Sequence, residues 1–125
     1  MAKGLLLVFT KPVSDDREDA FNRWYDNHHV PDVVGIEGFT SGTRYHISEQ
    51  QNRAGVETST IADLPYLAAY EIDADDPTTA IQNLLAGQRD EQGRRLDFVY
   101  EDETLDRDTV FSVFFEQITE PVTSG

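Results

Sequence analysis

Two segments of the chain are strand-like and apolar on both faces, and this feature limits the possible folds more than any other. Residues 4–10 read Gly-Leu-Leu-Leu-Val-Phe-Thr, and within 109–118 phenylalanine and valine occupy both faces of the alternating pattern. A strand that is apolar on both faces is typical of a sheet that is covered on both sides. Each face of the predicted sheet therefore needs a cover, either helices of the same chain or a second molecule.

Between these two segments the chain alternates helical and strand patterns. Residues 15–29 carry a stripe of aromatic and histidine positions at helical spacing, and residues 39–48 alternate as a strand with one polar face. A third strand is predicted over 66–73, and Asp76-Pro77 is a start signal for a second helix. The order strand-helix-strand, strand-helix-strand predicts the split βαβ arrangement of the ferredoxin-like fold, in the α+β class.

In this fold both helices cover one face of an antiparallel four-stranded sheet, so a monomer would leave the other face in water. The first and fourth strands are apolar on that side as well, and a second copy of the same sheet is the simplest cover. A chain of 125 residues has room for one such core. The prediction is a single domain over 1–125 that forms a homodimer.

Charge and composition exclude several classes of partner and chemistry. The chain has 24 acidic and 10 basic residues, a formal net charge of −14, which disfavours nucleic acids and anionic membrane surfaces as partners. The absence of cysteine excludes disulfides, thiolate metal sites and cysteine nucleophiles. The longest apolar run, 4–9, is too short to cross a membrane, and no signal-peptide cleavage pattern follows it. A cytoplasmic protein is therefore expected.

The segment 24–32 concentrates the residues best suited to chemistry. It reads Trp-Tyr-Asp-Asn-His-His-Val-Pro-Asp and holds the only tryptophan and two of the three histidines. Pro31 predicts that the first helix is interrupted near Val30, because proline disfavours helical geometry in the residue before it. One interpretation is structural: the aromatic side chains fill the core, and the histidines cap the end of the helix.

The other interpretation of this segment is functional. Histidine titrates close to neutral pH, so His29 or His28 can take up and return a proton at the mouth of a cavity. Trp24 and Tyr25 would then form an aromatic wall beside the imidazole.

The predicted strands add four further candidates. Arg44 and His46 share one face of the second strand, where Arg44 could hold a carboxylate or enolate oxygen or form a surface ion pair. His46 is either a second acid/base group or a solvated residue at the strand end. Tyr70 and Glu71 alternate on the third strand, and a half-buried Glu71 would have a raised pKa and could act as a base.

No pattern predicts a metal, cofactor or nucleotide site. Adjacent histidines on a helix point about 100° apart and rarely bind one ion together, and no His-x-x-x-His spacing is present. Phosphate-binding loops, dinucleotide fingerprints and nucleophile elbows are also missing from the sequence. The predicted chemistry therefore uses neither a metal nor a cofactor.

Residues 21–32, followed by Gly-Phe at 38–39 and Arg-Tyr at 44–45, resemble the EthD-like branch of the dimeric α/β-barrel superfamily. That family carries a Trp/Tyr-Tyr pair, a His-x-Pro motif, a Gly-Phe turn and an Arg-Tyr strand, and its histidine corresponds to His29. The resemblance implies a ferredoxin-like monomer that pairs sheet to sheet into a dimeric α/β barrel, with a ligand cavity between each sheet and its helices.

The resemblance implies several chemistries, because this superfamily includes cofactor-independent monooxygenases, polyketide cyclases, isomerases, lyases and haem-degrading enzymes. The leading hypothesis is a small cofactor-independent enzyme of lyase, isomerase or cyclase type. It would act by proton transfer on a hydrophobic carbonyl or aromatic metabolite, with His29 as general acid/base assisted by His46 or His28. Arg44 would hold the oxyanion, and the pocket would be shaped by Trp24, Tyr25 and Tyr70. The alternatives are a cofactor-free monooxygenase and a non-catalytic barrel that binds a small ligand.

Overall fold

The computed structural model describes residues 2–49, 63–86 and 104–125. In chain order the elements are β1 (Ala2–Thr10), a 3-10 turn η1 (Asp15–Arg17), α1 (Glu18–Trp24), a π-helical turn η2 (Tyr25–His29), α2 (Val30–Val34), β2 (Phe39–His46), β3 (Tyr66–Ala74), α4 (Pro77–Ala86), a 3-10 turn η4 (Arg107–Thr109) and β4 (Phe111–Glu116). Among these described elements, no helix is both long and apolar enough to span a bilayer.

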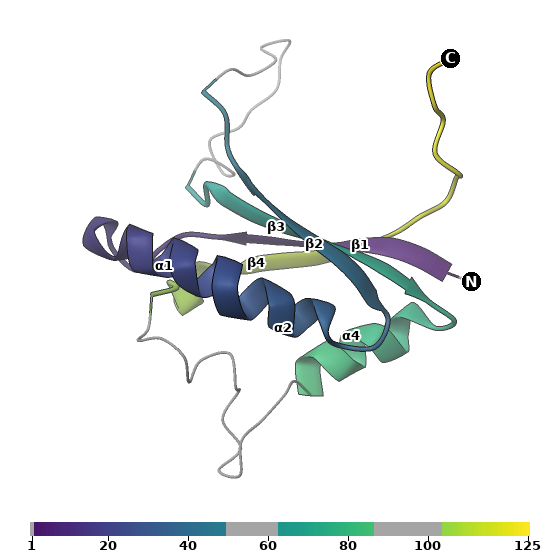
Figure 1. Ribbon diagram of the computed structural model, residues 1–125, viewed down its shortest axis with the longest axis horizontal. Helices are drawn as coiled ribbons and strands as arrows, with labels where there is room; N and C mark the ends of the chain where they lie inside the picture. Colours follow the sequence, from purple (N-terminus) through teal and green to yellow (C-terminus); the bar gives the residue numbers. More distant parts are fainter. Residues whose placement is uncertain (1, 50–62, 87–103) are drawn as a thin grey trace.

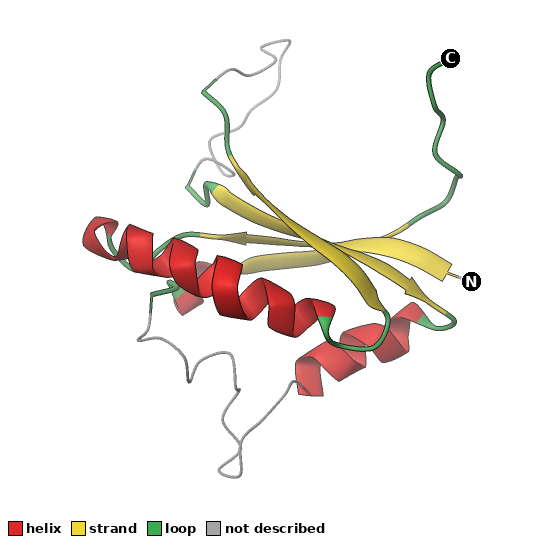
Figure 2. Cartoon of the chain, in the orientation of Figure 1, coloured by secondary structure: helices red, strands yellow, loops and turns green. Residues whose placement is uncertain are grey.

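The four strands form one sheet in the order β2-β3-β1-β4, and every neighbouring pair is antiparallel. Helices α1, α2 and α4 lie on one side of this sheet (Figures 1 and 2). The predicted α+β class and the ferredoxin-like order of elements are confirmed.

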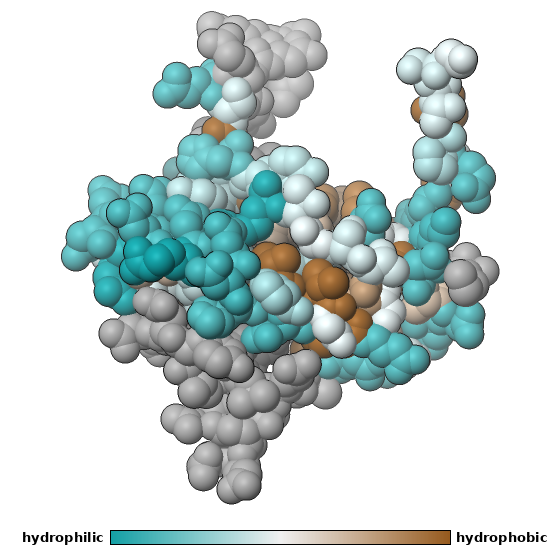
Figure 3. Space-filling view, viewed as in Figure 1, coloured by the Kyte–Doolittle hydropathy of each residue, from teal (hydrophilic) through white to brown (hydrophobic). Residues whose placement is uncertain are grey.

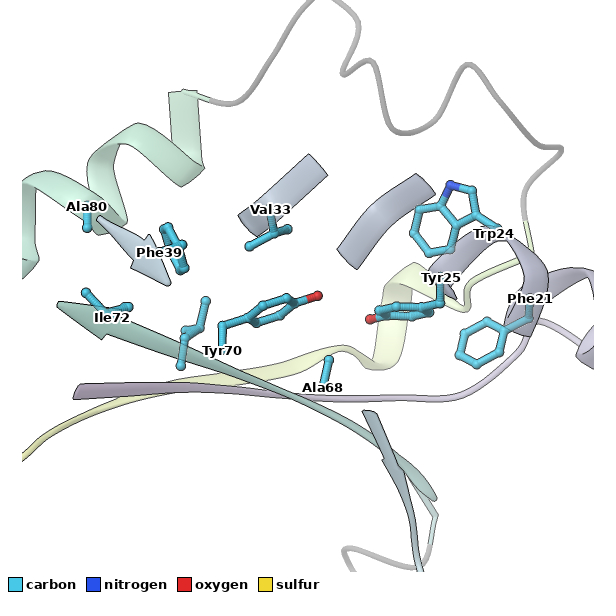
Figure 4. Packing of buried hydrophobic residues seen from close by; sticks show 10 residues of the cluster. Phe21, Trp24, Tyr25, Val33, Phe39, Ala68, Tyr70, Ile72 and Ala80 are labelled. Atoms are coloured by element: carbon cyan, nitrogen blue, oxygen red, sulfur yellow. The ribbon is translucent and has the colours of Figure 1, made fainter. Parts of the chain in front are cut away.

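The hydrophobic core lies between the sheet and the helices (Figure 4). Aromatic residues of the first helical segment pack against strand residues that face the helices, because alternate strand residues point to the same side. The buried cluster consists of Leu6, Phe21, Trp24, Tyr25, Val33, Phe39, Ala68, Tyr70, Ile72 and Ala80. On the helix-bearing surface, hydrophilic side chains cover α1, and apolar side chains gather between α2 and α4 (Figure 3).

The opposite face of the sheet, here called the outer face, is also apolar. In β1 the residues that point outward are Leu5, Leu7 and Phe9, and the register places Phe115, Val113 and Phe111 of β4 directly beside them. Large side chains on this face are exposed: Leu5 to 40%, Phe115 to 53% and Phe111 to 57%. The prediction that β1 and β4 are apolar on both faces is confirmed.

The predicted interruption of the first helix at Val30 is wrong. Val30 keeps helical angles of −61° and −48° before Pro31, and α1, η2 and α2 follow one another without a break. Pro31 lies in the first turn of α2, where its missing N–H is tolerated. The π-helical turn widens the helix just before Pro31, so the proline ring avoids the carbonyl that it would meet in a regular α-helix.

The beginning of β2 also differs from the predicted alternation. Phe39 pairs with Ile72 while Ser41 pairs with Glu71, so the register shifts at Thr40. Phe39 therefore lies in the core at 6% exposure, whereas Tyr45 points to the outer face at 54%. Strict alternation over 39–48 predicts one face for Phe39 and Tyr45, which is wrong because a bulge inserts one residue between them.

Candidate functional site

Tyr25 lies at the centre of a cluster of aromatic and cationic side chains where α1 passes into the π-helical turn. Its side chain is 1% exposed. Its ring centroid lies 5.2 Å from that of Phe21, and 5.0 Å from those of both Trp24 and His29. The guanidinium carbon of Arg44 lies 4.5 Å from the same centroid. An imidazole and a guanidinium therefore contact the ring of one buried tyrosine.

The imidazole of His29 is half-buried and is oriented by two aromatic rings. It stacks on Trp24 with centroids 4.7 Å apart and an interplanar angle of 24°, and it meets Tyr25 at 85°. Trp24 and His29 are five residues apart, which would separate them by about 140° on a regular α-helix. The i to i+5 register of the π-helical turn brings them to the same side. His28 precedes His29 in this turn and is also half-buried.

Arg44 reaches the cluster from the helix-facing side of β2. Its side chain is 14% exposed, and its Nη1 donates to Oδ1 of Asp26 at 2.8 Å. The guanidinium lies over the rings of Tyr25, Tyr66 and Phe21, at 4.5, 5.2 and 5.5 Å from their centroids. Its Nη2 is buried and has no hydrogen-bond partner within the described part of the chain. The cation therefore retains a donor for an anionic oxygen.

Tyr66, the first residue of the strand predicted over 66–73, is also a member of this cluster. Its hydroxyl donates to Oε2 of Glu18 at 2.7 Å and accepts from Nδ2 of Asn22 at 3.3 Å. Burial raises the pKa of Tyr66, and the neighbouring Glu18 raises it further, so the phenol is protonated at neutral pH. Its four-residue spacing from Tyr70, which places both on one strand face, is the signal that could have identified it.

His46 contacts the cluster through Tyr66 rather than through His29. Its ring meets Tyr66 edge-on with centroids 4.7 Å apart, and its Nδ1 lies 2.8 Å from the carbonyl oxygen of Ile47. The side chain is exposed at the end of β2. Arg44 and His46 lie on the same face of the strand, as predicted, and Tyr45 lies on the other.

Tyr70 faces the helices, and Figure 4 shows its hydroxyl pointing toward that of Tyr25. The side chain is 1% exposed. Glycine at position 42 makes this arrangement possible, since a Cβ there would lie 3.0 Å from the Tyr70 ring.

The structure does not bring Glu71 together with the other candidates. Consecutive residues of a strand point to opposite faces, so Glu71 lies on the outer face while Tyr70 lies in the core. The sequence suggests a half-buried carboxylate at Glu71. This prediction is wrong, because Glu71 is exposed. No group of three or more histidine, aspartate or glutamate side chains within the described ranges is arranged to hold a metal ion.

Comparisons with known proteins give a distant structural match. No protein-family model matches the chain, and no curated protein sequence matches it. Among solved structures, the crystal structure of an ethyl tert-butyl ether d (EthD) family protein from Bacillus halodurans C-125 is similar to this chain. The match covers 94% of this chain and 100% of that protein, with 16% sequence identity and a TM-score of 0.48.

Proposed function

We propose that this chain is a cofactor-independent enzyme of the EthD-like type, which moves protons on a hydrophobic carbonyl or aromatic metabolite as a lyase, isomerase or cyclase. The observation that supports the proposal is the contact of His29 and Arg44 with the ring of one buried tyrosine, Tyr25. An imidazole can remove and return a proton near neutral pH, and a guanidinium stabilises the oxyanion that forms on an adjacent carbonyl.

His29 is the proposed general acid/base. Its stack on Trp24 and its edge contact with Tyr25 limit the rotation of the imidazole, which favours a fixed direction of proton transfer. Removal of a proton from the carbon next to a carbonyl leaves an enolate, and return of the proton elsewhere completes an isomerisation. Attack of the same enolate on a second carbonyl of the substrate forms a carbon–carbon bond, and the alkoxide that results takes the proton back from the imidazolium to complete a cyclisation. His28 and His46 are the proposed assisting groups.

Arg44 is the proposed oxyanion partner. Three aromatic rings surround its guanidinium, so its charge is less screened by water than that of an exposed arginine. Its Nη1 is bonded to Asp26, and its Nη2 is the donor proposed to meet the substrate oxygen. Trp24, Tyr25 and Tyr70 would supply the apolar surface that holds a hydrophobic substrate.

The experiment that tests this proposal measures exchange of the α-protons of a panel of aryl ketones in D₂O by NMR. We expect His29→Asn to reduce the catalysed exchange roughly 10²–10⁴-fold per folded molecule, the usual contribution of a positioned acid/base. His28→Asn is the comparison variant: it removes a proposed assisting imidazole and leaves the His-x-Pro motif intact, so it should reduce the exchange less than His29→Asn does.

Equal exchange by His29→Asn and the native protein would exclude His29 as the acid/base. Oxygen consumption with a phenolic ligand would point instead to a cofactor-free monooxygenase. Binding of the ketones with no exchange by the native protein would point to a ligand-binding barrel without turnover.

We also propose that two copies of the chain pair through their outer faces. Exposed Leu5, Phe111 and Phe115 form a contiguous apolar surface across β1 and β4, which is unusual for a chain that stays monomeric in water. Sedimentation at micromolar protein should give twice the chain mass of 14.1 kDa. Phe115→Asp should give a folded monomer, and a native protein that sediments as a monomer would contradict the pairing.

A further inference from the structure

The segment after β4, residues 117–125, is here called the arm, and it leaves the body of the molecule. Its first residue is still attached to the sheet, since the backbone N–H of Gln117 donates to the carbonyl of Lys3 at 2.8 Å. Beyond that point the arm rises from the sheet on the side that carries no helix among the described elements (Figure 1). Every residue of the arm is exposed.

Two apolar side chains of the arm are left uncovered by the described part of their own chain. Ile118 is 91% exposed and Val122 is 97% exposed, the highest values among the large exposed hydrophobic side chains of the described residues. Residues four apart in an extended segment point to the same side, so both side chains can contact one surface. No surface within residues 2–49, 63–86 and 104–116 of this copy meets them.

The arm stands beside the outer face and does not lie on it. A hollow of about 530 Å³ separates the two. Leu5 and Phe115 of the outer face form its apolar wall, and Thr119 and Pro121 form the wall on the side of the arm. The exposed apolar surface of the sheet therefore continues, across this hollow, to the exposed apolar side chains of the arm.

We propose that the arm clasps a second copy of this chain, with Ile118 and Val122 packed on the partner subunit; this inference rests on the pairing of outer faces proposed above. A second copy of the chain can cover the outer face and the apolar side chains of the arm at the same time. A two-fold axis pairs outer face with outer face and gives each copy an arm directed at the other, so both arms become buried in one symmetric contact. The hollow is then the space into which the partner subunit fits.

The first test compares dissociation constants of the dimer by sedimentation or dilution. We expect the double variant Ile118→Ser/Val122→Ser to weaken the dimer at least about 100-fold, roughly tenfold for each apolar side chain lost. Its fold should be unchanged, because neither side chain is buried within its own chain. The matched control is Thr123→Ser/Ser124→Thr, which changes the arm at two exposed polar positions outside the hollow and should alter the dissociation constant by less than about twofold.

The second test shows which molecule the arm contacts. Because the chain has no cysteine, Thr123→Cys accepts a single nitroxide label and leaves Ile118 and Val122 in place. This labelled chain is mixed with a ¹⁵N-enriched chain that carries no nitroxide. We expect amide signals of the outer face of the ¹⁵N chain to broaden, which requires contact between molecules.

The outcomes separate this inference from the pairing on which it rests. A dimer whose dissociation constant is unchanged by the double variant overturns the arm contact and leaves the outer-face dimer standing. Broadening that occurs only when nitroxide and ¹⁵N are on the same chain also overturns it, since the arm would then fold onto its own sheet. A native protein that is monomeric at all concentrations overturns both the dimer and the arm contact.

Discussion

The guanidinium of Arg44 contacts an exposed aspartate, Asp26, on one side and is buried by three aromatic rings. Asp26 is 59% exposed and holds Nη1 of Arg44, so it competes with any anionic ligand for the guanidinium. An ion pair with one exposed partner contributes only about 0.2–1 kcal/mol. Asp26 is therefore weak enough as a partner to be displaced by a bound carboxylate or enolate.

We expect Asp26→Asn to tighten the binding of an aromatic carboxylate such as benzoate about two- to fivefold, because the neutral amide releases the guanidinium. Calorimetric titration measures the change. Asp19→Asn removes a different exposed charge from the same helical segment and is the matched control. Unchanged or weaker binding by Asp26→Asn would contradict the proposed role of Arg44.

Tyr66 makes the unfolding free energy depend on pH in the alkaline range. Its folded-state pKa is raised above the usual value of 10.0, first by burial, so the folded chain holds this proton more tightly than the unfolded chain. The stability linked to this proton is fully present below pH 10 and is lost as the pH rises through the folded-state pKa. We expect Tyr66→Phe to show a smaller loss of unfolding free energy above pH 10 in urea titrations. Parallel pH profiles for the variant and the native protein would contradict this.

At the scale of elements, the packing of β2 against β3 and α2 requires a glycine at position 42. A Cβ at Gly42 would lie 2.9 Å from Cγ1 of Val30 and 3.0 Å from the ring of Tyr70. We expect Gly42→Ala to lower the unfolding free energy by about 1–3 kcal/mol, as overpacking of a core does. Denaturant titration measures this difference.

The matched control for this prediction is Gly35→Ala at the end of α2. Gly35 has a φ of −74°, and an added Cβ would come no closer than 3.5 Å to neighbouring atoms. Alanine there should stabilise the chain by about 0.4–1 kcal/mol, because it restricts the unfolded state. Equal effects at the two positions would show that the contact with Tyr70 does not govern Gly42.

The order of the elements could be predicted from the sequence because hydrophobic periodicity is a local property. The stripe of Phe21, Trp24 and Tyr25 does face the core, and β1 is apolar on both faces. The π-helical turn and the bulge at Thr40 could not be predicted in this way. Each depends on one extra residue in an otherwise regular element, and packing against neighbouring elements decides where that residue is accommodated.

The candidate site was only partly predictable for a related reason. Helical spacing grouped Trp24, Tyr25 and His29, because all three lie on one continuous segment. The contact between Tyr66 and Glu18 joins residues 48 positions apart and depends on the register of β3, which no local pattern contains. Glu71 was misplaced because a strand pattern assigns alternation but does not identify which face the helices cover.

At the scale of the whole molecule, charge opposes compactness and association. Each chain carries a formal net charge of −14, and the repulsion among acidic groups is weakened by salt, whose screening length is about 8 Å at physiological ionic strength. We expect the melting temperature to rise between dilute buffer and about 0.15 M sodium chloride. Differential scanning calorimetry measures the change, and a steady fall over this range would contradict the prediction.

The π-helical turn lets the helix carry one extra residue without separating Trp24 from His29. The two rings stack although five residues separate them, because the turn completes the rotation that a regular helix would leave incomplete. A one-residue deletion within 25–28 would restore ordinary winding and leave the imidazole four residues after the indole, about 40° away on a regular helix, so both rings would stay on one side. In evolutionary terms, the aligned pair can survive the gain or loss of one residue here without any substitution. Sequence alignments that slide a gap across this segment would therefore pair the wrong histidine with the His-x-Pro position of a relative.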